Sequence, residues 1–429
     1  MAKVAISVHN IAKGMSMATP LVENTSKADV IIAGGAYVGL SLAVAIKKAA
    51  PQLEIVVVDG APKDAWKTDP RASAIAAAAI RMLDQLECWT AVRPNAQPIN
   101  EMIITDSRTA DPTRPVFLNF AGDVAPGEPF AYMIENRFLN AALHAQAQKL
   151  NITLIEATKV VHFENNEASI KVTLDNGEIF QAQLLVGADG VRSQLRAMAN
   201  IKTLHWPYGQ MGIVCTVSHE RPHHGRAEEH FLPAGPFAIL PLTGNRSSLV
   251  WNERDDKAQR LMDADDVIFQ SELEMRFGHH LGALKLEGQK RAYPFGLTLA
   301  RQFIASRFAL AGDAAHGIHP ISGQGLNLGF RDVAALAEVV VETARLGIDI
   351  GSFAALERYQ TWRRFETVRM GATTDLLNRM FSNDSTPLRV LRDFGLGIVD
   401  RIPTVKDYLI KEASGLIKGS PRLLLGQAL

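Results

Sequence analysis

The stretch Asp29-Val-Ile-Ile-Ala-Gly-Gly-Ala-Tyr-Val-Gly39 joins a short apolar run to a glycine-rich turn. The apolar run, residues 29–33, predicts a strand that is buried on both faces. Residues 40–50 are rich in Ala and Leu, carry Lys47 and Lys48 near their end and are followed by Pro51, which predicts a helix. The β-branched run at residues 54–58 then predicts a second strand. Together these elements form one βαβ unit, which implies a parallel sheet with helical crossovers.

The glycine-rich turn is a candidate site for a diphosphate group. Glycines let a diphosphate approach the backbone at a helix N-terminus, where free N–H groups and the helix dipole favour anions. A P-loop would need Gly-Lys-Ser/Thr, whereas Leu40 follows Gly39, so NTP hydrolysis is not predicted. Asp59 ends the second strand, where the hydroxyl groups of a ribose would lie. The alternative is a tight turn without a ligand. Ala36 occupies the middle glycine position and puts a methyl group near the expected diphosphate.

A second segment, Leu184-Leu-Val-Gly-Ala-Asp189-Gly-Val-Arg-Ser193, is an apolar strand that ends in Asp-Gly. The polar start of a helix follows it. On its own this segment could equally be a capped turn between a strand and a helix.

A third segment, residues 308–327, reads Phe-Ala-Leu-Ala-Gly-Asp-Ala-Ala-His-Gly-Ile-His-Pro-Ile-Ser-Gly-Gln-Gly-Leu-Asn. Its Asp313 ends a predicted strand, where a carboxylate can accept hydrogen bonds from a sugar-alcohol chain. The Pro-x-x-Gly-Gln-Gly loop then opens a long helix. The N–H groups at that helix start can hold an electron-rich ring that becomes anionic.

Composition narrows the class of protein and its compartment. The 429 residues are 47% apolar and 21% charged, which is typical of a globular chain of two or three domains. The 45 basic residues balance the 45 acidic ones, so no overall field attracts nucleic acid. Only Cys88 and Cys215 occur, which excludes a disulfide framework and indicates a reducing compartment. We therefore expect a cytoplasmic protein without a nucleic-acid partner.

The three segments together resemble the FAD-dependent aromatic hydroxylases of the para-hydroxybenzoate hydroxylase fold. The pattern Gly-Asp-Ala-Ala-His-x-x-His-Pro-x-x-Gly-Gln-Gly-x-Asn at residues 312–327 resembles more narrowly the ubiquinone-biosynthesis hydroxylase family. The stretch at 381–385 and the long tail at 388–411 agree with that narrower match. The resemblance extends over residues 28–420, nearly the whole chain.

The fold class that we expect is α/β, with a discontinuous Rossmann-like FAD-binding domain. The α/β elements are dispersed along the chain, and strand-rich stretches interrupt them. A β-rich substrate domain and C-terminal helices complete the expected architecture. The expected ranges are 1–27 for an N-terminal extension; 28–97, 134–204 and 293–370 for the FAD-binding domain; 98–133 and 205–292 for the substrate domain; and 371–429 for the C-terminal helical region.

The resemblance implies, residue by residue, which positions contact FAD. Ala36 departs from the usual glycine of the family. The implied contacts are Gly34, Gly35 and Gly39 with the diphosphate; Asp59 with the ribose; Arg71 and Arg137 with the cofactor as a whole; Asp189 in the motif shared between FAD and the pyridine nucleotide; Gly312 and Asp313 with the ribityl chain; Pro320 at the reactive face of the isoalloxazine; and Gly323, Gln324, Gly325, Leu326 and Asn327 with its pyrimidine edge.

The chemistry that the resemblance implies belongs to the cofactor. Reduced flavin would react with O2 to give a flavin hydroperoxide, which an electron-rich phenol attacks. The expected activity is hydroxylation of a lipophilic, polyprenylated phenol in ubiquinone biosynthesis, with no catalytic acid or base assigned. The sequence has no second dinucleotide turn, so no separate NAD(P)H domain is expected, and the choice of external electron donor, NAD(P)H or a reductase, stays open. The alternatives are another aromatic or lipid substrate, or a non-catalytic flavoprotein scaffold in a biosynthetic assembly.

Histidines and aromatic residues give weaker signals. His316 and His319 have the helical spacing of a metal pair, but the adjoining Pro320 and glycines favour structural roles beside the flavin, so no metal site is predicted. Some aromatic residues of the strand-rich part are expected to line an apolar substrate cavity, and the others to be ordinary core. They are Trp206, Tyr208, Phe231, Phe237, Trp251, Tyr293 and Phe295.

Residues 401–429 carry a basic amphipathic pattern, with five basic residues and two acidic ones. The apolar positions that recur at helical spacing are Val405, Tyr408, Leu409, Ala413, Leu416 and Ile417. Two interpretations stay open. The helix either packs its apolar stripe on the FAD-binding domain or lies in the interface of the inner membrane, where a polyprenylated substrate must reside.

Overall fold

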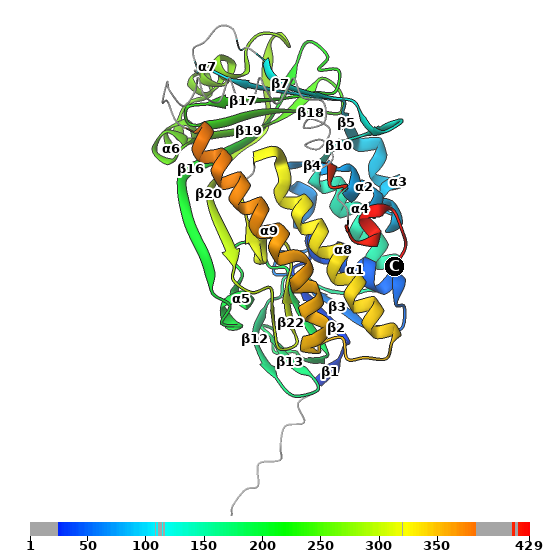
Figure 1. The fold of residues 1–429 in the computed structure, drawn as a ribbon. Coiled ribbons are helices and arrows are strands. Elements are labelled where there is room, and N and C mark those ends of the chain that lie inside the picture. Colours follow the sequence, from blue (N-terminus) through cyan, green and yellow to red (C-terminus); the bar gives the residue numbers. More distant parts are fainter. Residues whose placement is uncertain are drawn as a thin grey trace, which may run out of the picture.

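The computed structural model describes residues 25–107, 109, 114, 116–319, 321–382, 414–416 and 419–429. Several expectations lie outside these residues: most of the N-terminal extension, Pro320, the tail at 388–411, and most of the apolar positions from 405 to 417. Within the described residues an α/β body carries a broad β-sheet at one end (Figure 1).

The βαβ unit lies in the middle of a six-stranded sheet with the order β11-β3-β2-β15-β22-β21. The first five strands in this order are parallel, and the last is antiparallel to its neighbour. β2 and β3 are buried along their whole length, as expected for apolar strands covered on both faces. The bounds are β2 (Val30–Ala33), β3 (Ile55–Val58), β11 (Thr153–Ile155), β15 (Leu184–Gly187), β21 (Ile304–Ala305) and β22 (Phe308–Leu310).

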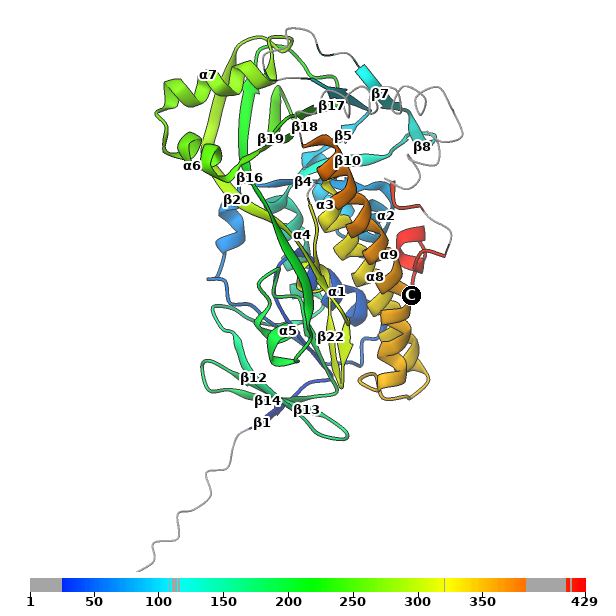
Figure 2. The ribbon, with the colours of Figure 1, turned by 60° about the vertical axis from the view of Figure 1, so that its left-hand side comes forward.

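Helices from distant parts of the sequence pack against one another beside this sheet. The helix that follows β2, α1 (Tyr37–Ala49), contacts both α4 (Asn136–Lys149) and α8 (Gln324–Arg345). The long α9 (Phe353–Phe381) runs alongside α8, as Figures 1 and 2 both show. The shorter helices are α2 (Ala77–Gln85), α3 (Trp89–Val92), α5 (Gln194–Met198), α6 (Asp255–Asp263) and α7 (Asp266–Phe277).

An eight-stranded sheet of order β23-β20-β16-β19-β18-β17-β6-β7 forms the β-rich end. β6 pairs with β17, so the two separate strand-rich ranges of the sequence meet in one sheet. β16 and β20 each span 17 residues and run from the α/β body into this end (Figure 2), so neither expected domain boundary beside them falls in a loop. The bounds are β6 (Glu101–Asp106), β7 (Val116–Ala121), β16 (Thr203–His219), β17 (Arg226–Leu232), β18 (Gly235–Leu242), β19 (Arg246–Arg254), β20 (Leu284–Ala300) and β23 (His316–Gly317).

Three small sheets complete the described part of the chain, with the orders β1-β14-β13-β12, β4-β10-β5 and β8-β9. Their strands are β1 (Thr25–Lys27), β4 (Ala72–Ala76), β5 (Ala96–Ile99), β8 (Asp123–Ala125), β9 (Glu128–Pro129), β10 (Ala131–Glu135), β12 (Val160–Asn165), β13 (Ile170–Leu174) and β14 (Ile179–Ala182). Five short 3₁₀ helices are also described: η1 (Ala65–Thr68), η2 (Arg93–Asn95), η3 (Gly312–Ala314), η4 (Ile321–Gly323) and η5 (Arg422–Leu425).

The described end of the chain is docked on the protein body. Leu423 and Leu424 of η5 are buried in the main core. Arg422 donates its backbone N–H and its Nε to Glu338 of α8, at 2.8 and 3.1 Å, and its Nη2 to Glu342. η5 is therefore packed on the protein body, while the choice between packing and membrane contact for the apolar stripe at 405–417 stays open. No helix of the described residues is long and apolar enough to cross a bilayer.

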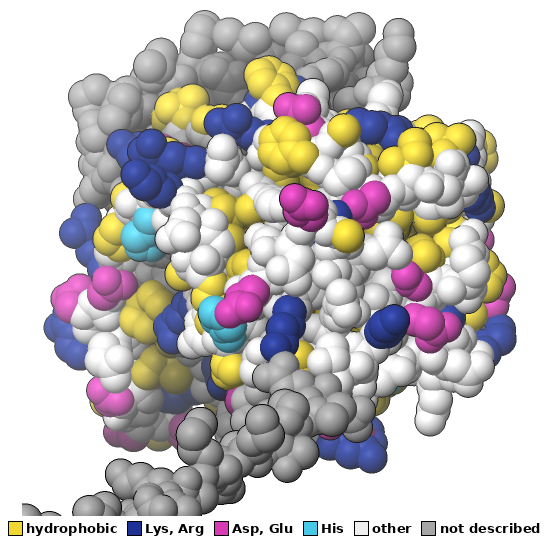
Figure 3. Space-filling view, turned by 90° about the horizontal axis from the view of Figure 1, so that it is seen from below, with side chains coloured by type: hydrophobic (Ala, Val, Ile, Leu, Met, Phe, Trp, Pro, Cys, Tyr) yellow, Lys and Arg dark blue, Asp and Glu magenta, His cyan; other side chains and the backbone are white. Residues whose placement is uncertain are grey.

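The end of the molecule that carries β12 and β13 has a mixed surface. Seen from below, Lys and Arg side chains are interspersed there with Asp and Glu and with apolar groups (Figure 3). No single sign of charge covers this face, in keeping with the balanced overall composition.

Candidate active site

A cavity of about 850 Å³ opens where the parallel strands end. One side of it is formed by the residues that follow β2, β3, β15 and β22, and the other by the inner face of the eight-stranded sheet. Ligands of open α/β sheets bind outside the carboxyl ends of the strands, and cavities of this size hold organic cofactors and substrates. The cavity is therefore the candidate active site.

Most of the residues singled out in the sequence line this cavity. Pro320 lies outside the described residues, and three others, Gly39, Gly312 and Arg137, are not part of the lining. The residues that do line it are Gly34, Gly35, Asp59, Arg71, Asp189, Asp313, Gly323, Gln324, Gly325, Leu326 and Asn327.

Gly39 and Gly312 serve the packing that shapes the cavity. A Cβ on Gly39 would lie 1.8 Å from the carbonyl oxygen of Gly34, so α1 can approach the turn only without a side chain there. Gly312 has a φ of +63°, and a Cβ on it would lie 3.2 Å from the side chain of Val38. These two glycines therefore allow the glycine-rich turn and the end of β22 to pack closely against α1.

Arg137 has partners away from the cavity. It lies at the start of α4, is exposed, and forms an ion pair with Glu135 at 3.0 Å. Its guanidinium group also lies over the ring of Phe138, 4.8 Å from the centroid. The geometry therefore gives no support to the expected contact between Arg137 and the cofactor.

Two helix N-termini open into the cavity without a side-chain cap. Ala36 precedes α1 and Gly323 precedes α8. Neither residue has a polar side chain that could cap its helix, and both line the cavity. The first N–H groups of a helix have no partner within the helix, and they carry the positive end of its dipole. Both helix starts therefore suit a ligand group that is anionic or becomes anionic.

Asn327 fixes the start of α8 against β4. Its Oδ1 accepts the backbone N–H of Ala76 at 2.9 Å, and its Nδ2 donates to the carbonyl oxygens of Ala74 and Gly323 at 2.9 and 3.2 Å. The hydrogen-bonding groups of the Asn327 side chain are therefore used by backbone groups of the protein. Its contribution to the cavity is to hold the loop and its backbone in place.

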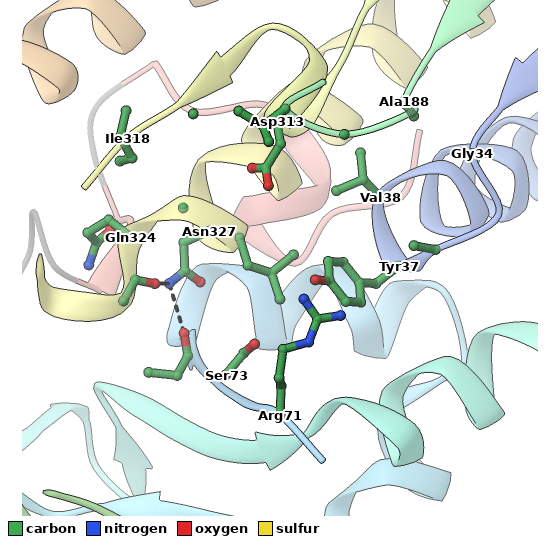
Figure 4. Close-up of a pocket in the computed structure, with 18 of the residues that line it drawn as sticks. Gly34, Tyr37, Val38, Arg71, Ser73, Ala188, Asp313, Ile318, Gln324 and Asn327 are labelled. Carbon is green, nitrogen blue, oxygen red and sulfur yellow. Dashed lines mark hydrogen bonds between the residues drawn. The ribbon is translucent and has the colours of Figure 1, made fainter. Parts of the chain in front are cut away.

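Asp313 points into the cavity from the strand end opposite Arg71 (Figure 4). Its carboxylate is open to the cavity and has no hydrogen-bond or ion-pair partner among the described residues. Desolvation by the surrounding walls raises the pKa of Asp313, although His316 and Arg71 oppose this effect. A carboxylate in this position suits a ligand that brings hydroxyl donors, such as a sugar-alcohol chain.

Arg71 is held in place at the edge of β4 by a bidentate ion pair. Its Nε and Nη2 each lie 2.8 Å from one oxygen of Asp69. The hydrogen bonds to Asp69 raise the pKa of Arg71 despite its burial, so the guanidinium stays charged. Figure 4 shows it beside Tyr37 of α1, where it presents a fixed positive charge to the cavity.

A buried carboxylate, Asp332 of α8, positions the turn that carries Asp313. Its Oδ2 accepts the backbone N–H of Gly312 at 2.9 Å and lies 2.5 Å from Nε2 of His316, while its Oδ1 accepts Nε of Arg363 at 2.8 Å. Burial alone would raise the pKa of Asp332, but His316 and Arg363 lower it below its usual value. Arg363 of α9 also pairs with Glu366, which binds Arg331.

The sequence did not reveal this network because its members come from four separate elements, η3, β23, α8 and α9. Asp332 lies in the middle of α8 and Arg363 in the middle of α9, and no short motif contains both. His316 is used here, whereas His319 lies beside Asn252 instead, so the two histidines do not act as a pair. No group of residues suited to a metal ion occurs in the part of the chain that the structure describes.

The cavity wall on the sheet side is largely apolar. Alternate residues of β17, β18 and β19 face it, together with Ile99, Met102 and Phe295. Of the seven aromatic residues considered in the sequence, Phe295 lines the cavity. Phe237 and Trp251 lie on the opposite face of the sheet, where Trp251 packs against Phe269 of α7.

These features fit FAD. The unpartnered Asp313 suits the hydroxyl groups of its ribityl chain, and the two uncapped helix starts suit its diphosphate and the electron-rich edge of its ring. Asp59, at the end of β3, lies where a ribose would be expected.

Comparison with known proteins agrees with this fit. The family described as FAD binding domain matches residues 27–364. Ubiquinone hydroxylase UbiL of Rhodospirillum rubrum is 44% identical over 406 residues, which make up 93% of each protein. The 3-demethoxyubiquinol 3-hydroxylase of Escherichia coli is 33% identical over 90% of this chain and 98% of its own length. The crystal structure of p-nitrophenol 4-monooxygenase PnpA from Pseudomonas putida is similar at a TM-score of 0.75, covering 90% of this chain and 98% of that one at 18% identity, which bears on the fold alone.

Replacing Asp313 by Ala is expected to weaken FAD binding about ten- to a hundredfold, because a charge-assisted hydrogen bond contributes roughly 1.5–3 kcal/mol. Titration of the apoprotein with FAD measures the loss. Asp266→Ala, an exposed carboxylate in the first turn of α7, is the matched control and should bind as the parent does. Parental affinity in Asp313→Ala would show that Asp313 does not contact the cofactor.

Replacing Asp332 by Asn should lower the free energy of unfolding by about 3–5 kcal/mol, because it leaves buried donors without their charged acceptor. Glu342→Gln, which alters more exposed ion pairs of the same helix, should lower it by about 1 kcal/mol or less. Urea denaturation of the apoprotein measures both.

The effect of Asp332→Asn should also depend on pH. The folded pKa of Asp332 is lowered, so its stabilising contribution is present above the unfolded value of about 4 and declines as the pH falls through the folded value. The parent and the variant should therefore converge in acid. A constant difference from pH 7 down to pH 3 would contradict the ionised state assigned to this residue.

Proposed function

The chain belongs to the FAD binding domain family and, within it, to the ubiquinone-biosynthesis hydroxylases, and from this premise we propose that it hydroxylates the aromatic ring of a polyprenylated phenol. It is an FAD-dependent monooxygenase with O2 as co-substrate. The relatives named above act, by their names, on ubiquinone or demethoxyubiquinol. The corresponding substrate class for this chain is a lipophilic precursor of the same kind.

The apolar wall is the observation that carries this proposal. The side chains that face the cavity from the sheet include those of Ala227, Ala238, Leu240 and Val250. The cationic residues among the lining are Arg71, Lys159 and Arg192, and all three belong to segments beside the candidate cofactor contacts. A phenol with a hydrocarbon chain finds apolar surface here, and burial of each CH₂ group contributes about 0.8 kcal/mol.

A soluble aromatic acid fits the same wall less well. The side chain of Glu229, which lies on this wall at 4% exposure, adds no positive charge to it. No Lys or Arg that lines the cavity in the described ranges comes from the strands of this wall. The substrate ring is therefore expected to carry no carboxylate or other charged substituent.

FAD, when bound, supplies the activation of O2 and the transfer of one oxygen atom to an electron-rich ring. The protein residues hold the reactants and exclude water. Asp313 and Arg71 anchor the cofactor from opposite walls, and the two uncapped helix starts offer N–H groups to its charged parts. The apolar wall holds the phenol near the ring and keeps out bulk water, which favours transfer to substrate over release of peroxide.

A single-turnover experiment tests this function without knowledge of the electron donor. FAD-loaded protein is reduced with dithionite without oxygen, in the presence of a 2-polyprenylphenol in detergent, and then mixed with ¹⁸O₂. The expected product is the phenol with one labelled oxygen atom on its ring, detected by mass spectrometry. Para-hydroxybenzoate, as the soluble comparison, should give peroxide and little labelled product.

Release of peroxide with every phenol tested, although FAD remains bound, would contradict catalysis and favour the scaffold alternative. Labelled para-hydroxybenzoate with unlabelled polyprenylphenol would keep the monooxygenase and exclude the lipophilic substrate.

We also propose a peripheral contact with the membrane, because a polyprenylated phenol resides in the bilayer. The basic amphipathic pattern of residues 401–429 supports this contact. Since η5 is docked through Leu423 and Leu424, the proposed contact involves the residues before it.

Reversing the charge of Lys406, Lys411 and Lys418 to Glu should reduce sedimentation with anionic liposomes, because each lysine near the surface contributes about 1 kcal/mol. High salt should reduce parental binding in the same way. The control reverses three exposed lysines elsewhere, Lys63, Lys202 and Lys285, and should bind as the parent does. Equal sedimentation of both triple variants and the parent at low salt would exclude this segment as the contact.

A further inference from the structure

One polar side chain on the apolar wall of the cavity has an unsatisfied hydrogen-bonding group. Along β19, Leu249 and Trp251 face the hydrophobic core between the eight-stranded sheet and helices α6 and α7, while Val250 and Asn252 face the cavity. Asn252 is 3% exposed, and its Oδ1 has no hydrogen-bond partner within the described residues. A buried polar group without a partner is costly, so its retention beside a cavity points to a ligand.

The other end of the Asn252 amide faces His319. The His319 ring is completely buried and lies between the rings of Tyr208 and Phe295, with centroids 5.2 and 5.1 Å away. Its Nδ1 accepts the backbone N–H of Ile321 at 3.3 Å, and its Nε2 lies 3.5 Å from the Asn252 amide. Burial lowers the pKa of His319 to about 4, against the opposing effect of Asp375, so the ring is neutral near pH 7.

The protonation of His319 determines which end of the amide faces the substrate. A neutral imidazole has one N–H, and because Nδ1 accepts a hydrogen bond, the proton is on Nε2. The Nε2–H of His319 needs a hydrogen-bond acceptor. Rotating the Asn252 amide by 180° places its oxygen beside Nε2 and its NH₂ group where the oxygen was. The NH₂ group of Asn252 then occupies the position that has no partner in the protein, and it can donate to an oxygen atom of a ligand.

The location of this pair suits the reacting end of the substrate. His319 belongs to the segment between β23 and α8, whose Ile318 and Ile321 line the cavity. Phe295 lines it too and lies over Gly212, where a Cβ would come within 2.0 Å of the ring. The amide is thus close to the loop that leads into α8, while the rest of the wall offers apolar surface.

We propose that the Asn252 amide binds the hydroxyl group of the phenol and that His319, as a positioning residue, holds the amide in the orientation that does so. This inference rests on the proposed function, since it names the polar contact of the same substrate. Hydrogen bonding at this point would orient the ring, and the apolar wall would then hold the hydrocarbon chain.

The test compares a short-chain prenylphenol with the analogue in which the hydroxyl group is replaced by hydrogen. The dissociation constants of both are measured on FAD-loaded protein by the change in flavin absorption. The parent should prefer the phenol by about tenfold, as expected for one buried hydrogen bond. Asn252→Leu, which is similar in size but apolar, should bind both compounds with nearly equal affinity, and Asn252→Ala serves the same purpose if the first variant does not hold FAD.

Two further variants separate hydroxyl recognition from the shape of the wall. Val250→Ala, on the same strand and face, should change both dissociation constants by a similar factor and keep the tenfold preference. His319→Phe should keep the packing between Tyr208 and Phe295 but reduce the preference, because the amide loses its partner.

A parental preference retained in whichever Asn252 variant holds FAD would overturn the proposal, and one retained in His319→Phe would overturn the role of His319. If the parent binds neither compound and gives no labelled product in the single-turnover experiment, the proposed function fails together with this inference. Labelled product combined with equal binding of the two compounds by the parent would overturn this inference alone.

Discussion

The site depends on one fully buried carboxylate, Asp332, which collects hydrogen bonds from three elements of the chain. Removing a charge from water costs several kcal/mol, and partners of opposite charge must offset it. Arg363 provides that charge, and His316 Nε2 and the backbone N–H of Gly312 lie within hydrogen-bonding distance of the same carboxylate. Because Gly312 is fixed in this way, the next residue, Asp313, is held at the cavity wall with its carboxylate free for a ligand.

The cavity joins two kinds of wall that suit two kinds of ligand. Where the parallel strands end, uncapped helix starts and Asp313 offer donors and a charge, as a polar cofactor requires. The inner face of the eight-stranded sheet offers apolar surface with few polar groups, as a hydrocarbon-bearing phenol requires. The long β16 and β20 run through both parts of the fold, so the two walls are held in a fixed relation (Figure 2).

Much of the fold could be predicted because its signals are local. The β-branched runs became β2 and β3, and the residues after them line the cavity, because glycine turns and strand ends depend on neighbouring residues. Gly39 packs on the backbone of Gly34 and Gly312 on the side chain of Val38, and their expected contact with FAD stays a prediction. The pairing of Asp332 with Arg363, and the neighbourhood of Asn252 and His319, depend on tertiary packing between distant elements, which no short pattern contains. Alternation along β19 still separates Asn252 from Trp251 once the strand is placed.

We expect the Asp332 network to present Asp313 to the ribityl chain of FAD. A crystal structure of the FAD-loaded protein tests it most directly. The expected structure has a ribityl hydroxyl oxygen within hydrogen-bonding distance of the Asp313 carboxylate, about 2.5–3.0 Å, with Asp332 still bound to the N–H of Gly312. An Asp313 carboxylate that contacts no atom of FAD, or an FAD bound away from the N-termini of α1 and α8, would contradict it.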